Sequence, residues 1–325
     1  MLLIREDEVF SLLGFDEAIE AVEDGFKLMG LGQAVNTPRR RTIMPNAVLH
    51  VLQGSVLGNY GVAGLKAYLS TKRGTRFVVL LFGLEEGGEP LAVIEADWLG
   101  RVRTGAASAV AARHMARTNA EVLGLVGTGG QARTQFEALS RVMKLRLVKV
   151  MSRSRKHAED FARFVGSRGG FDAKIVDDYG EACDADVLVT ATNSKDPFID
   201  GKRLASGIHV NAVGSNWPNR AELMPSAVER AAVIAVDDVE QAKLEAGGDL
   251  IMAGIDWSRV VGGLSEVVLG RVKGGRPSDD AVTIFKSMGI AVEDLVVGKL
   301  VYEKALKKGM GGIEVEFKGF HAFQT

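Results

Sequence analysis

From about residue 120 onward, short apolar runs alternate with amphipathic runs. Apolar runs of this length predict buried strands, and six of them occur, at 121–126, 145–151, 172–176, 186–192, 208–214 and 232–238. Residues 130–143 and 156–165 have the spacing of amphipathic helices. Strands that alternate with helices are typical of a parallel sheet covered by helices. We therefore predict a doubly wound α/β sheet in this part of the chain.

The first 115 or so residues follow a different pattern. Apolar spacing predicts a helix over 16–32, which Asp16 can cap and glycines end. Strand-like runs follow at 47–56, 61–69 and 76–95, and the last of these turns at Gly87–Gly88. Consecutive strands joined by short turns favour antiparallel pairing. The sequence thus predicts a second, mainly antiparallel sheet with helices.

Two more helices relate these parts to each other. Residues 104–117 are rich in small side chains and predict a helix that bridges the two sheets. Residues 291–308 also have apolar positions at helical spacing, and we expect this helix to pack back on the first part of the chain. The predicted class is α/β: a Rossmann doubly wound domain at 118–290, and a discontinuous α+β domain at 1–117 and 291–325.

Composition excludes several classes of protein. The 325 residues, 46% hydrophobic and 25% charged, can bury a substantial core. No stretch offers the roughly 18 apolar residues of a membrane helix, and the N-terminus turns acidic too soon for a secretory signal. A net charge of −1 gives no support for a nucleic-acid partner. The single cysteine, Cys183, favours a cytoplasmic location, and the lack of HExxH, CxxC or close His/Cys clusters predicts no metal site.

A glycine-rich turn follows the first strand of the predicted parallel sheet. Gly127, Gly129 and Ala132 form a G-x-G-x-x-A pattern between a strand and a helix, the setting in which this motif binds a dinucleotide. The first glycine permits the turn, the second lets the backbone approach a pyrophosphate, and the alanine lets the helix lie close to the strand. A structural glycine turn is the alternative interpretation.

The turn after the second strand lacks the acid that usually binds the adenosine ribose. Ser152 and Arg153 stand there. An acid would repel a 2′-phosphate, whereas a serine hydroxyl can donate a hydrogen bond to it and a guanidinium can bind it through its planar fork. We therefore predict a preference for NADP(H), with NAD(H) possible. The alternative is that Arg153 and Arg155 only form a solvated helix start.

Several longer motifs resemble one family. They include "RVRTGAASAVAARHMAR" (101–117), "GLVGTGGQAR" (124–133), "HVNAVGSNWPNRAEL" (209–223) and "TIFKSMGIAVEDLVVGKLVYE" (283–303). Together they resemble the ornithine cyclodeaminase/mu-crystallin family, which also includes archaeal-type alanine dehydrogenase and pyrroline-carboxylate reductases. The resemblance implies a Rossmann domain, a discontinuous domain that forms a homodimer, and a small 2-imino or 2-amino acid as substrate.

The resemblance also implies roles for particular residues. Arg41, Lys66 and Arg103 match the cations that hold the substrate carboxylate beside the nicotinamide, and the apolar neighbours of Lys66 predict a lowered pKa that suits proton transfer. The predicted cofactor-binding residues are Thr104, Gly127, Gly129, Gly130, Gln131, Ala132, Ser152, Arg153, Ser154, Thr190, Thr192, Val213 and Ser287.

Asn216, a candidate catalytic residue, departs from the pattern of the cyclodeaminases and of the alanine dehydrogenase, which carry an aspartate there; the departure weakens ornithine cyclisation most and alanine dehydrogenase activity less. An asparagine can hydrogen-bond an amine or imine but cannot take its proton at neutral pH. This favours an NAD(P)H-dependent oxidoreductase that reduces the C=N bond of a small 2-imino acid, or acts in reverse as an amino-acid dehydrogenase. Two alternatives stay open: a cyclodeaminase-type lyase that recycles NAD internally, and a binding protein without turnover. If Arg76 points into the pocket, a second acidic group on the substrate is favoured.

Overall fold

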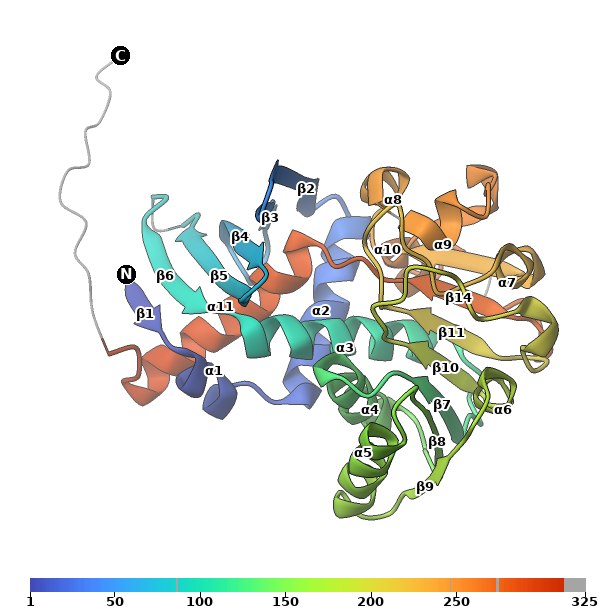
Figure 1. The fold of residues 1–325 in the computed structure, drawn as a ribbon. Helices are drawn as coiled ribbons and strands as arrows, with labels where there is room; N and C mark the ends of the chain where they lie inside the picture. Colours follow the sequence, from blue (N-terminus) through green and yellow to red (C-terminus); the bar gives the residue numbers. More distant parts are fainter. Residues whose placement is uncertain (86, 246, 273–274, 313–325) are drawn as a thin grey trace.

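The computed structural model describes residues 1–85, 87–245, 247–272 and 275–312, which form two sheets connected by helices (Figure 1). The blue-to-cyan strands near the N-terminus form one sheet, and the strands from β7 onward form the other. The predicted fold class is confirmed. The domain boundaries stay a prediction, and residues 313–325 of the predicted discontinuous domain lie outside the described residues.

The sheet that follows residue 120 is parallel throughout. Within the described residues it has eight strands in the order β13-β12-β14-β11-β10-β7-β8-β9. These are β7 (Val122–Val126), β8 (Leu147–Met151), β9 (Asp172–Ile175), β10 (Val187–Thr190), β11 (His209–Ala212), β12 (Val233–Val236), β13 (Val260–Gly263) and β14 (Thr283–Lys286). All six predicted strands are present. The apolar pattern does not predict β13, which is half glycine, or β14, which has polar residues at both ends.

Both faces of this sheet are buried. In β12, Val233 and Ala235 belong to one hydrophobic core cluster, whereas Ile234 and Val236 belong to another. The helices of this part are α4 (Gly130–Val142), α5 (Arg155–Ser167), α6 (Tyr179–Cys183), α7 (Pro225–Arg230), α8 (Val239–Glu245), α9 (Gly247–Ile251) and α10 (Leu264–Val268), with short 3-10 helices at Gly201–Arg203 and Trp257–Arg259. Burial on both faces explains why the strands read as continuous apolar runs rather than alternating ones.

The first sheet has the order β1-β6-β5-β4-β3-β2 within the described residues. Its strands are β1 (Leu2–Ile4), β2 (Ala34–Met44), β3 (Ala47–Val56), β4 (Val62–Thr71), β5 (Gly74–Gly83) and β6 (Pro90–Glu95). All pairs are antiparallel except β1 with β6, which confirms the mainly antiparallel prediction. Gly87 and Gly88 both have positive φ, 71° and 84°, as the predicted turn requires. The pattern misses β2 because three arginines break its apolar alternation.

The helices that pack with this sheet include α1 (Glu6–Leu12), α2 (Phe15–Gly30), α3 (Asp97–Met115) and α11 (Ala291–Lys308), and α8 of the other part also contacts β2. The bounds of α11 and its packing on α2 and β3 confirm the prediction. The prediction that Asp16 caps α2 is wrong. Gly14 is the N-cap, and its backbone N–H donates to the Glu17 carboxylate at 3.2 Å, so Asp16 lies inside the first turn.

The bridging helix α3 is longer than predicted and begins at Asp97. It contacts α2 and α11 on one side, and α4, β11 and β14 on the other. Its small side chains make this possible: a Cβ at Gly105 would lie 2.6 Å from the carbonyl oxygen of Thr134 in α4.

In the described part of the chain, no helix combines the length and apolarity needed to cross a bilayer.

Candidate active site

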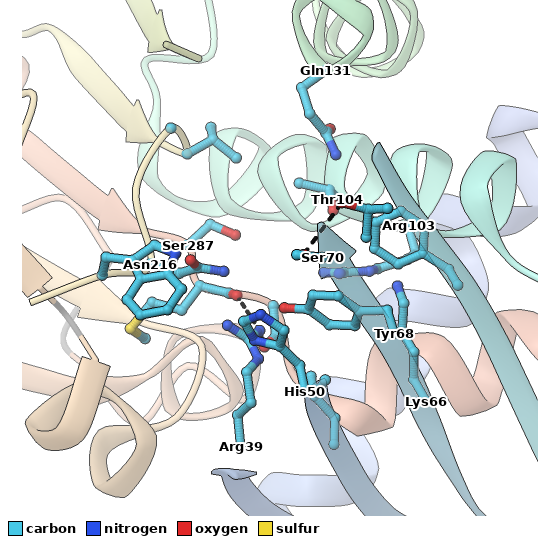
Figure 2. Close-up of a pocket in the computed structure, with 18 residues that line it drawn as sticks. Arg39, His50, Lys66, Tyr68, Ser70, Arg103, Thr104, Gln131, Asn216 and Ser287 are labelled. Carbon is cyan, nitrogen blue, oxygen red and sulfur yellow. Dashed lines mark hydrogen bonds between the residues drawn. The ribbon is translucent and has the colours of Figure 1, made fainter. Parts of the chain in front are cut away.

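A cavity of about 340 Å³ lies where the first sheet meets the carboxyl ends of the parallel strands (Figure 2). Ligands of open α/β sheets bind at this edge. Lys66, Tyr68 and Ser70 reach the cavity from β4, because alternate side chains of a strand point to the same face. Figure 2 shows Lys66 and Arg103 on one side of the cavity, opposite Asn216. The structure thus brings together three residues that are distant in sequence.

Lys66 and Arg103 share a buried carboxylate. Asp294 of α11 lies 2.7 Å from Lys66 Nζ and 3.0 Å from Arg103 Nε through the same Oδ1 atom, and Glu293 lies 2.7 Å from Arg103 Nη1. Gly100 of α3 makes room for Lys66, since a Cβ there would lie 2.7 Å from Nζ. The two cations are therefore held in fixed positions at the bottom of the cavity.

Burial changes the ionisation of these groups. It lowers the pKa of Lys66 to about 8, against the attraction of Asp294. This agrees with the lowered pKa that the apolar neighbours of Lys66 predict. Burial also raises the pKa of Glu293 to about 8. The positive charge of Arg103 lowers this pKa, but the nearby carboxylates of Asp237 and Asp294 raise it further. An anionic ligand beside Arg103 would therefore favour the protonated form of Glu293.

Two arginines of β2 flank the cavity in different ways. Arg39, which sequence reasoning missed, lies on the cavity wall, donates to the Met288 carbonyl at 2.7 Å, and lies 3.2 Å from Glu245. Arg41 is not among the lining residues. Its guanidinium pairs with Glu245 and donates to the backbone carbonyl of Asn216 at 3.0 Å. Arg41 therefore holds the loop that carries Asn216.

A buried ionic network holds the same loop from behind. Glu222 accepts hydrogen bonds from the hydroxyls of Thr190 and Thr192 at 2.7 Å each, and from the Gly214 backbone N–H at 2.9 Å. Asp249 accepts from the backbone N–H of Glu222 at 2.6 Å and lies 2.9 Å from Lys286 Nζ. Lys286 in turn donates to the carbonyl of Ser215. The network therefore links the ends of β10, β11 and β14.

Aromatic rings complete the wall. His50 and Tyr68 stack with ring centroids 4.2 Å apart and an interplanar angle of 8°, and Tyr68 also contacts Phe77 at 4.9 Å. Trp217 lies edge-on to His50 at 5.8 Å and beneath the guanidinium of Arg41 at 4.6 Å. Sequence reasoning missed Tyr68, although the alternation of β4 from Lys66 onward places it on the same face. The cavity thus combines cations with flat apolar surfaces.

A larger groove of about 880 Å³ follows the glycine-rich turn. Gly127 has a φ of 110°, and a Cβ there would overlap the Ala191 carbonyl oxygen, so only glycine fits this turn. Gly129 faces open space and precedes the N-terminus of α4, where free N–H groups can bind phosphate. The groove residues therefore fit a dinucleotide. Gln131 lines both the groove and the cavity and connects the two.

The predicted cofactor residues fall into three groups. Those that line the groove are Gly127, Gly129, Gly130, Gln131, Ser152, Arg153, Ser154 and Thr192. Thr104, Val213 and Ser287 line the cavity instead, together with Gln131. Ala132 and Thr190 are buried and line neither hollow. Ala132 lets α4 pack on the sheet, and Thr190 acts through its hydrogen bond to Glu222.

Arg76 points away from the cavity. It lines a separate hollow together with Glu6, Glu95 and Asp97, and its guanidinium donates to the Thr75 carbonyl at 3.2 Å. It therefore gives no support for a second acidic group on the substrate.

Comparison with known proteins places this geometry in a family. The model of the ornithine cyclodeaminase/mu-crystallin family matches residues 1–309. An archaeal alanine dehydrogenase dimer with bound NAD is 36% identical, with a TM-score of 0.91 over 98% of this chain and 99% of that one. The Δ1-pyrroline-2-carboxylate reductase of Thermococcus litoralis, in complex with NADH and L-proline, is 30% identical, with a TM-score of 0.91 over 97% and 100%. Ketimine reductase mu-crystallin of Mus musculus is 35% identical over 69% of this chain and 68% of its own. The chain belongs to the ornithine cyclodeaminase/mu-crystallin family.

Proposed function

We propose that this protein is an NAD(P)H-dependent oxidoreductase that reduces the C=N bond of a small 2-imino acid, and that it acts in reverse as an amino-acid dehydrogenase. The observation that carries the proposal is a cavity with three cations, Arg39, Lys66 and Arg103, joined at Gln131 to a groove that fits a dinucleotide. Family relatives are named as reductases of imines and as an alanine dehydrogenase. When bound, the reduced nicotinamide supplies a hydride.

Different residues of the cavity bind different parts of the substrate. Lys66 and Arg103 clamp the substrate carboxylate, since charge-assisted hydrogen bonds from an ammonium and a guanidinium fix an anion in one orientation. Arg39 adds a third positive charge to the cavity wall. Asn216 hydrogen-bonds the substrate nitrogen without removing its proton. Arg41 holds the Asn216 backbone.

A cyclodeaminase-type lyase is the less favoured alternative. That reaction requires repeated proton transfer at nitrogen, and Asn216 on the cavity wall cannot serve as the acid–base group. The lyase reaction would consume no net cofactor, so an assay of nicotinamide oxidation distinguishes it from imine reduction.

The test follows the nicotinamide absorbance band with NADPH and NADH in separate reactions. We expect rapid oxidation with the cyclic ketimine pyrroline-2-carboxylate. Oxidation only with pyruvate plus ammonium would move the assignment to an alanine-type dehydrogenase. Ammonia release from ornithine without cofactor oxidation would overturn the proposal in favour of the lyase.

We also propose a preference for NADP(H) over NAD(H). Arg153 is exposed on the groove wall and makes no ion pair with the described residues, whereas Arg155 pairs with Glu159 and Asp177 at 3.3 Å each. Ser152 accepts a hydrogen bond from Thr128 at 3.3 Å, at the end of β8. A free guanidinium and a hydroxyl suit a 2′-phosphate, and Ser152 stands where an acid would repel it.

Replacing Arg153 with glutamine (Arg153→Gln) should raise the Kd of NADPH about 10-fold, the effect of losing one charge-assisted hydrogen bond. The Kd of NADH should stay within about twofold, because NADH has no 2′-phosphate. Titration of cofactor fluorescence measures both constants. Arg155→Gln is the matched control and should change neither. Equal changes for the two cofactors in Arg153→Gln would contradict the predicted role.

The assembly we propose is a homodimer. The strand face opposite the cavity exposes Leu49, Leu69 and Val78 on three neighbouring strands, with 36–40% of each residue accessible. Large apolar side chains gathered on one sheet face are typical of a protein interface. The archaeal relative is described as a dimer.

The buried single cysteine, Cys183, is consistent with the cytoplasmic location that we propose.

A further inference from the structure

The substrate nitrogen takes up a proton in this reaction, because the C=N electron pair moves onto nitrogen when hydride reaches carbon, and a side chain of the cavity can supply it. Asn216 cannot supply it. Among the other lining residues that the structure describes, Ser70, Thr75, Thr104 and Ser287 carry aliphatic hydroxyls, which do not ionise in the accessible pH range. The guanidinium groups of Arg39 and Arg103 keep their protons in this pH range, which leaves His50, Lys66 and Tyr68 to consider.

His50 is neutral in this setting. Its Nδ1 accepts a hydrogen bond from Arg41 Nε at 3.2 Å, so the ring proton belongs on Nε2. Burial, together with the charges of Arg41 and Arg39, lowers the pKa of His50 to about 4. A neutral imidazole is a poor acid, and His50 instead supports the ring that stacks on it.

Lys66 is better placed to bind the substrate carboxylate than to protonate the substrate nitrogen. Its ammonium is held by Asp294 at 2.7 Å, beside Arg103, and only 2% of the residue is exposed. Donating a proton would remove the charge that binds the substrate anion at the moment of reaction. Lys66 therefore serves best as a fixed cation.

Given the proposed imine reduction, on which this inference rests, we propose that Tyr68 is the catalytic residue that donates the proton to the substrate nitrogen. Tyr68 lies two residues beyond Lys66 on the same strand face, about 6.6 Å further along the strand. Its hydroxyl has no hydrogen-bond partner among the described residues and points toward the middle of the cavity (Figure 2). A substrate with its carboxylate on Lys66 and Arg103 thus presents its nitrogen toward this hydroxyl.

The surroundings of Tyr68 suit this step. Stacking on His50 and contact with Phe77 fix the ring and hence the hydroxyl direction. Hydride adds to the imine carbon, the C=N π pair moves to nitrogen, and nitrogen takes the Oη proton, which leaves a phenolate. The positive charge of Arg41 lies close enough to attract that phenolate. Water that enters the open cavity then returns the proton.

A binding experiment tests the hydrogen bond without turnover. Pyridine-2-carboxylate carries an accepting nitrogen next to the carbon that bears the carboxylate, whereas benzoate has a C–H there. Quenching of tryptophan fluorescence reports both, because Trp217 lines the cavity. Tyr68→Phe keeps the ring and removes the hydroxyl, so it should raise the Kd of pyridine-2-carboxylate about 10-fold and change that of benzoate less than about twofold.

Tyr60→Phe is the matched control, since Tyr60 donates to the Ala21 carbonyl at 3.4 Å and does not line the cavity. In turnover, Tyr68→Phe should lower kcat about 100-fold with the Kd of NADPH unchanged. Equal weakening of both ligands, or of neither, would overturn the role of Tyr68. If the unmodified protein binds neither carboxylate, the proposed function fails instead.

Discussion

Replacing Lys66 with methionine (Lys66→Met) should lower kcat/KM for imine reduction by about 10²- to 10⁴-fold. Methionine has a similar length without the charge, so the substrate carboxylate loses one of its buried partners. Removing one partner of a buried ion pair costs about 3–5 kcal/mol, and each 1.36 kcal/mol is tenfold in rate. The fold should survive, because Asp294 keeps its contact with Arg103 at 3.0 Å. Steady-state kinetics with pyrroline-2-carboxylate measures the effect.

The lowered pKa of Lys66 gives this prediction a pH signature. With a pKa of about 8, the ammonium loses its proton as the pH rises through 8, so the KM for the anionic substrate should rise on the alkaline side. Lys66→Arg keeps a charge that does not titrate in this range, and its alkaline rise should disappear. An unchanged alkaline limb in Lys66→Arg would assign the titration to another group. The Kd of NADPH is the control and should be the same in all three proteins.

A second large effect is expected for Lys286, which is fully buried with Asp249. Lys286→Met leaves that carboxylate without its cation, and we expect the free energy of unfolding to fall by about 3–5 kcal/mol. Denaturant unfolding measures it. Lys243→Met is the matched control, because Lys243 is exposed and pairs with Glu240 at 2.7 Å on the surface. Exposed pairs contribute about 0–1 kcal/mol.

The double variant Lys286→Met/Asp249→Asn separates charge from packing. Asparagine keeps the Oδ1 that accepts from the backbone N–H groups of Glu222 and Leu223, and it removes the buried charge. We therefore expect it to recover much of the lost stability. If the double variant is as unstable as the single one, the loss arises from packing around Lys286 rather than from an unpaired charge.

Much of the fold follows from local pattern. Helix α11 begins and ends where its apolar spacing predicts, and six parallel strands are visible as apolar runs because both sheet faces are buried. The apolar pattern does not predict β2 and β14, because Arg39 and Lys286 are buried polar residues and Arg41 is partly buried. Their burial is made possible by carboxylates from other elements, which no local window contains.

The sequence predicts some residues of the site but not the partners that hold them. Motifs indicate Lys66 and Arg103, and strand alternation would have added Tyr68. The partner of both cations, Asp294, is 228 residues from Lys66 and 191 from Arg103. Such a pairing depends on how α11 packs against β4, which the sequence pattern alone does not specify.

The contact of α3 with α4 has a consequence for how the protein moves. Because Gly105 brings the two backbones together at Thr134, the helix that carries Arg103 and the helix that starts the dinucleotide groove touch without intervening side chains. Interiors packed this closely deform little. We therefore expect the helix that carries Arg103 and the helix that starts the dinucleotide groove to move as one body, so that the cavity and the start of the groove keep their spacing.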